Sequence, residues 1–153
     1  MKRYCLSAML AVAGIGLALT ASPANAGDEL PFKASTEVVL QSSEVNEGTV
    51  HLIYSGTANV THLGLAEAVA VVDIDLVTGI ATGLVTLTKR DVDSITFEFV
   101  QVFDPALGGY VGEFQITGGS GKFEGAVGSG TLLNMPGDEP GTRVGEYEGT
   151  IIY

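Results

Sequence analysis

Residues 114–131 read FQITGGSGKFEGAVGSGT, and this stretch decides the fold more than any other part of the chain. Its first four residues alternate apolar and polar side chains, and strand-like sequence resumes after the glycines. Gly118, Gly119 and Gly121 can adopt positive φ angles, so the chain can reverse tightly there. Phe123 can then fold back as an apolar plug at the end of a sheet. Three later glycines permit close backbone approach: Gly125, Gly128 and Gly130.

The same stretch does not fit a phosphate-binding loop. A P-loop needs Gly-Lys followed by Ser or Thr at the start of a helix. Here Lys122 is followed by Phe-Glu-Gly and then by strand-like sequence. The glycines therefore indicate a turn motif and not a nucleotide site.

Alternating and β-branched segments continue along the chain after residue 27, and helical periodicity is hard to find. Short connections rich in turn-forming residues separate these segments. Eight strands are expected: Phe32–Gln41, Thr49–Ala58, Leu65–Val77, Ile80–Lys89, Ser94–Phe103, Tyr110–Thr117, Ala126–Leu133 and Val144–Tyr153. The pattern favours an all-β fold, a single eight-stranded antiparallel β-barrel in meander order, because closure removes exposed sheet edges.

Residues 1–26 have the layout of a secretory signal peptide. Lys2 and Arg3 precede an apolar run at 8–19, and Ala-Asn-Ala at 24–26 is a small-x-small cleavage site. Cleavage after Ala26 would leave a barrel domain of residues 27–153 in the periplasm or outside the cell. An uncleaved N-terminal anchor is the alternative. No later apolar run approaches the ~20 residues of a membrane helix, so no membrane span is expected after cleavage.

Composition restricts the function further. The chain has a formal net charge of −11, and the leader holds two of its seven basic residues and none of its eighteen acidic ones. The remainder would carry −13, which disfavours nucleic acid as a partner. The single cysteine, Cys5, lies in the leader, so thiol catalysis and cysteine-based metal sites are excluded from the exported protein.

The strand at Ser94–Phe103 carries the clearest pattern for a site. Phe97, Phe99 and Phe103 share one face with Gln101. We predict that these four residues line a barrel interior and bind a ligand, with His62 as a polar group at the cavity entrance. A structural hydrogen bond is the preferred role for His62. Glu37 and Glu98 are weak catalytic candidates, and no metal site is predicted.

Both faces of the segment Leu65–Val77 are largely apolar at its start. One face would line the barrel interior. The other would meet a second layer or another subunit, because a monomer rarely exposes a large apolar band. A homo-oligomer is therefore a hypothesis.

Residues 116–130 resemble the glycine-rich signature of the allene oxide cyclase and dirigent superfamily, and residues 56–64 resemble a segment of its secreted bacterial relatives. The resemblance implies an eight-stranded barrel with an apolar cavity and with no metal or organic cofactor. Members act on lipid-derived epoxides or phenolic radicals, or have no known activity. The segment around Glu37 does not reproduce the plant cyclase pattern, so no catalytic residue is transferred.

The functional expectation is a secreted barrel that binds a small apolar molecule. One alternative is a cofactor-free cyclase or isomerase, or a dirigent-type guide of radical coupling. The second alternative is a structural or surface protein without a ligand. An open cavity favours the first two, and an interior filled by side chains favours the third.

Overall fold

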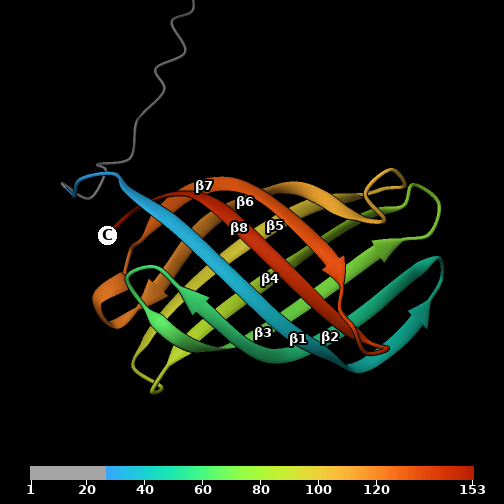
Figure 1. The fold of residues 1–153 in the computed structure, drawn as a ribbon, viewed down its shortest axis with the longest axis horizontal. Coiled ribbons are helices and arrows are strands. Elements are labelled where there is room, and N and C mark those ends of the chain that lie inside the picture. The colour runs from blue at the N-terminus through green and yellow to red at the C-terminus, as the bar shows by residue number, and fades with distance from the viewer. Residues whose placement is uncertain (1–26) are drawn as a thin grey trace, which may run out of the picture.

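A computed structural model describes residues 27–153, which form a closed barrel (Figure 1). Each strand pairs antiparallel with the next, and β8 returns to pair with β1. The strands are β1 (Leu30–Asn46), β2 (Thr49–Val60), β3 (Gly64–Asp75), β4 (Ile80–Lys89), β5 (Asp93–Asp104), β6 (Gly109–Ser120), β7 (Val127–Pro136) and β8 (Thr142–Ile152). The all-β fold, the eight antiparallel strands and the meander order are confirmed. The predicted signal peptide lies outside the described residues.

The strand boundaries differ most from expectation in β1. This strand continues to Asn46, and its register shifts between Leu40 and Ser42. The extension pairs with the start of β2, although residues 41–46 are exposed and show no apolar alternation. Backbone pairing in a long hairpin therefore extends this strand beyond its apolar pattern.

The turns of a meander alternate between the two ends of the barrel. The turns after β2, β4 and β6 lie at the end that also holds residue 27 and the C-terminus, and the other turns lie at the opposite end (Figure 1). Among the described residues, no helix has the length and hydropathy for a membrane crossing.

The end that holds the C-terminus is filled by a dense aromatic core, and we call it the closed end. The rings of Phe32, Phe97 and Phe114 lie 5.2–6.4 Å from one another. The turns add Leu63 and Phe123, which are 2% and 0% exposed. Such burial removes water from the barrel axis, so this half of the barrel supplies most of the packed core.

The glycine-rich stretch forms the turn after β6 and closes this end. Gly121 has a φ of +62°, a conformation that favours glycine, and it opens the short 3₁₀ helix η1 (Gly121–Phe123). The Phe123 side chain then packs inward against Tyr153, with 4.7 Å between the ring centroids. The apolar plug predicted from the sequence is therefore present.

Candidate functional site: a cavity with one polar wall

The opposite half of the barrel contains a cavity, and we call this the open end. Its lining includes Tyr110, the second residue of β6, and Arg143, the second residue of β8. It also includes Ile74, which lies one residue before the end of β3. The cavity therefore begins where the strands leave the turns of the open end and runs inward toward the aromatic core.

The side of the cavity formed by β2, β3 and β4 is apolar apart from the hydroxyl of Tyr54. Its lining residues include Leu52, Ala68, Ala70, Val72 and Val85. Ala68 and Ala70 are 1% and 9% exposed, and their small side chains leave space where a larger residue would fill the barrel. We call this side the apolar wall.

The side formed by β5 to β8 and by β1 carries most of the polar groups, although Phe99 and Val38 also line it. Its polar residues are Gln101, Tyr110, Asn134, Arg143, Tyr147 and Thr36. Tyr110 pairs with Asn134, and Asn134 pairs with Gly145, which lies two residues from Arg143 on the same face of β8. Neighbouring strands therefore bring these side chains together, and we call this side the polar wall.

Two buried oxygen atoms of the polar wall have no hydrogen-bond partner among the described residues. They are Oε1 of Gln101 and Oδ1 of Asn134. Gln101 as a whole is only 4% exposed. An unsatisfied buried polar group costs about 1–3 kcal/mol, and such groups are rare in native proteins. These oxygens are therefore the buried acceptors of this wall whose donors the described residues do not supply.

Arg143 brings a positive charge to the same wall. Its Cζ lies 5.4 Å from the ring centroid of Tyr110, in a cation–π contact that holds the guanidinium at the cavity. The ion pairs found in residues 27–153 are Lys33–Glu148 and His51–Asp73, so no carboxylate of this region pairs with Arg143. The five donors of the guanidinium are thus available to an anion.

Tyr147 is a neutral hydroxyl in this wall. Burial raises the pKa of Tyr147 to about 12, and a hydrogen bond with Thr36 opposes that rise. Gly145 makes room for both side chains. A Cβ at this position would lie 2.6 Å from Oγ1 of Thr36 and 2.9 Å from the Tyr147 ring.

The cavity is narrow. Its open space is about 30 Å³, within an envelope of about 580 Å³ that includes solvent at the mouth. One water needs roughly 10–15 Å³ on this measure, so about two waters fit. A larger occupant has to be slender or has to displace side chains at the mouth.

The structure places the predicted ligand-binding residues in three different environments. Phe99 and Gln101 line the cavity. Phe97 is fully buried in the aromatic core, 4.9 Å from the Tyr147 ring. Phe103 lies near the end of β5, is 51% exposed and contacts Tyr110 at 5.4 Å. The shared face was predicted from alternation, but the depth along the barrel was not.

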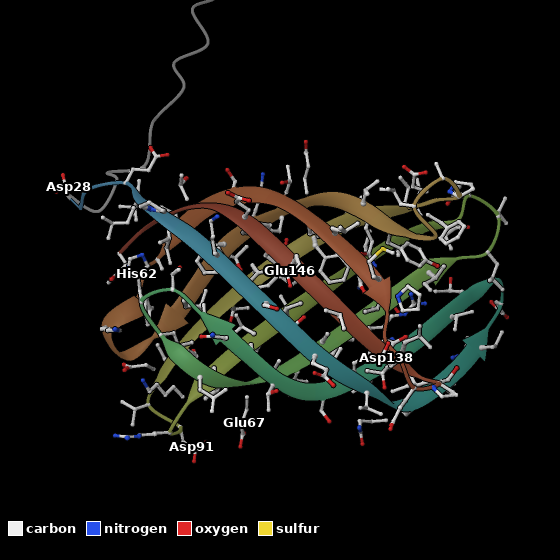
Figure 2. The ribbon with its side chains drawn as sticks, viewed as in Figure 1. Asp28, His62, Glu67, Asp91, Asp138 and Glu146 are labelled. Atoms are coloured by element: carbon white, nitrogen blue, oxygen red, sulfur yellow. The ribbon has the colours of Figure 1, made fainter. Side chains whose placement is uncertain are left out.

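His62 does not line the cavity. It lies in the turn after β2, at the closed end (Figure 2), and its Nε2 is 2.8 Å from the carbonyl oxygen of Pro31. Its ring centroid is 5.7 Å from that of Tyr153. This turn belongs to the plugged end and not to the cavity mouth, and the preferred structural hydrogen bond is consistent with the contact to Pro31.

Both weak catalytic candidates point away from the cavity. Glu37 and Glu98 are exposed on the outer face, where Glu98 pairs with Leu84 and Gln115. Glu98 lies in an outer groove with about 930 Å³ of open space, together with Asp73 and Glu113. The cavity lining itself contains no carboxylate, histidine or cysteine. Among residues 27–153, no three potential metal ligands of these types form a cluster.

Most of the polar wall was not predicted from the sequence. Arg143, Gly145 and Tyr147 alternate with Glu146 and Glu148, and this alternation places them on the face opposite the two acids. That pattern was the available signal. Asn134 had none, because a single amide in a glycine-rich strand does not reveal which face is inside.

Comparison with known proteins adds no family assignment. No protein-family model matches the chain, and no curated protein is detectably similar to it in sequence.

Proposed function

We propose that this barrel binds a small molecule in the cavity at its open end. The observation that carries the proposal is Gln101, a nearly fully buried amide that lines the cavity and whose oxygen has no hydrogen-bond donor among the described residues. An unsatisfied buried group costs free energy unless a bound molecule supplies its partner, and this supports a binding role over a purely structural one. The apolar wall supports a ligand with an apolar body, as ligand pockets combine apolar surfaces with a few polar anchors.

Binding is proposed in preference to catalysis because of what lines the cavity. Acid–base catalysis works best with a group whose pKa lies near the working pH. Tyr147 has its pKa raised to about 12, and no carboxylate or histidine belongs to the lining. A cyclase or isomerase reaction in this cavity would therefore lack a ready base.

The family and the cell compartment remain proposals as well. The closed eight-stranded barrel is compatible with membership of the allene oxide cyclase and dirigent superfamily. The sequence of residues 1–26 supports export to the periplasm or the medium.

Native mass spectrometry of the protein purified from its own compartment tests the binding proposal. We expect added mass that disappears on denaturation. Ala70→Leu fills the cavity and should abolish the added mass. Val69→Leu is the matched control, since Val69 immediately precedes Ala70 in β3 and lies 45% exposed on the outer face.

Thermal unfolding of both variants checks that they fold. A bare polypeptide mass for the wild-type protein, unchanged after incubation with lipid and phenolic extracts, would contradict the proposal. So would equal retention of ligand by Ala70→Leu and Val69→Leu.

A further inference from the structure

We infer that the ligand is a small organic anion that also carries a hydroxyl or N–H donor. This inference rests on the proposed function, because it assigns the chemistry of the molecule that fills the same cavity. It follows from how polar and apolar groups are distributed around the barrel interior.

The anionic group is assigned from Arg143. The guanidinium lines a cavity whose remaining groups are neutral, and Tyr110 holds it in place through the cation–π contact. No carboxylate of the described chain pairs with it, although the chain is strongly acidic. A planar guanidinium binds a carboxylate through two parallel hydrogen bonds, which makes a carboxylate the preferred partner.

The donor is assigned from the two amide oxygens. Oε1 of Gln101 and Oδ1 of Asn134 accept hydrogen bonds and cannot give them. A ligand with only an anionic group or only a hydrocarbon chain leaves both unpaired. A site built to hydrogen-bond a hydroxyl or amine rejects the analogue that lacks it.

The register gives the orientation of the ligand. Arg143 pairs with Pro136, the last residue of β7, so it lies at the mouth. Gln101 pairs with Gly112, two residues further along β6 than Tyr110 and thus further from the open end. The anionic group therefore lies at the mouth, where Asn134 pairs with Tyr110, and the donor to Gln101 lies deeper inside. The body of the ligand lies against Ala68 and Ala70.

Ordered water is the competing occupant. The cavity has room for about two waters, and such waters are an alternative source of donors for the polar wall. Water gives no preference among organic probes, however, so a set of matched probes distinguishes the two cases.

The test uses native mass spectrometry and calorimetry with two skeletons, each of which has to displace side chains at the mouth because the open space holds only about two waters. The aromatic set is 4-hydroxybenzoate, benzoate and p-cresol. The alkyl set is 8-hydroxyoctanoate, octanoate and 1-octanol. In at least one set, we expect the hydroxy acid to bind about tenfold more tightly than each of the other two compounds, the acid without a hydroxyl and the neutral compound without a carboxylate.

Two variants assign the two groups. Arg143→Gln should remove the advantage of the hydroxy acid over the neutral compound, and Gln101→Leu should remove its advantage over the simple acid. Lys33→Gln controls for the change in net charge, since Lys33 is exposed at the outer surface and pairs with Glu148. Its binding profile should match the wild-type profile.

Each outcome decides a different point. The inference is overturned if the hydroxy acid and the neutral compound bind equally well. It is also overturned if Arg143→Gln leaves the affinity for the hydroxy acid unchanged. If none of the six probes binds while the purified protein retains a native ligand, the inference fails and the proposed function stands. If the cavity takes neither probe nor native ligand, both fail and water is the occupant.

Discussion

Replacing Phe123 with alanine tests whether the glycine-rich stretch stabilises the barrel through its plug. Phe123 is 0% exposed, and its ring packs 4.7 Å from that of Tyr153 at the closed end. The substitution removes the whole ring and leaves a cavity between the turn and the end of the last strand. The backbone of the turn should remain, because the glycines that shape it are unchanged.

The expected loss can be estimated from this burial. A fully buried Phe→Ala substitution typically costs about 3–5 kcal/mol of unfolding free energy. For a domain of this size, each kcal/mol lowers Tm by about 4 °C, so we expect a fall of about 12–20 °C. Phe103→Ala removes the same side chain where it is 51% exposed, and it should cost about 1 kcal/mol.

Thermal and urea unfolding followed by far-ultraviolet circular dichroism measure both variants under the same conditions. The two substitutions change composition identically, so the difference between them reports burial alone. If Phe123→Ala lowers Tm by less than about 4 °C, or by no more than Phe103→Ala does, the plug is not a stabilising element and the reasoning is refuted.

Further predictions concern the polar wall and the turns. Tyr147 stays protonated to about pH 12 in the folded state but ionises near 10 when unfolded, so the folded state binds more protons between these values. Stability should therefore fall by about 2 kcal/mol from pH 10 to 12, and urea unfolding of Tyr147→Phe should lack this part of the loss. Gly145→Ala should lower the unfolding free energy by about 1–3 kcal/mol, because its Cβ meets Thr36 and the Tyr147 ring; an unchanged urea midpoint would contradict this. The backbone N–H groups of Thr78 and Val77 hold the pKa of Asp75 below its usual 3.8. The ionised carboxylate therefore stabilises the folded state, and this stabilisation is lost as the pH falls through the lowered pKa. Asp75→Asn should then show a weaker loss of stability in acid, measured by the same unfolding assay.

Strand alternation was sufficient to predict the barrel. Each strand of a closed sheet has one buried face, and the apolar side chains of β3 and β5 mark that face at every second residue. In β7 the pattern fails, because glycines such as Gly128 and Gly130 occupy inner positions and carry no apolar signal. The sequence therefore predicted the number of strands better than it predicted which side chains face inward.

The location of the site needed one further step of geometry. In a meander, alternate turns lie at the same end, so the turn with His62 and the turn with Phe123 share an end once the strand order is known. His62 lies at the end that Phe123 plugs, so it does not lie at the entrance of a cavity that opens at the other end. Combining the predicted plug with the predicted meander would have moved the site to the turns at the opposite end.

The closed half of the barrel holds the aromatic core, and the open half holds the proposed binding cavity. The closed half holds Phe32, Phe114 and Phe123 at 0–1% exposure, and a core of this kind stabilises the fold. The open half keeps two unsatisfied buried oxygens, which cost free energy in an empty protein. Substitutions should separate along this division. Changes at the closed end lower Tm, whereas removing Gln101 by Gln101→Leu should leave Tm unchanged or higher, because it deletes an unsatisfied group, and should affect only what the cavity binds.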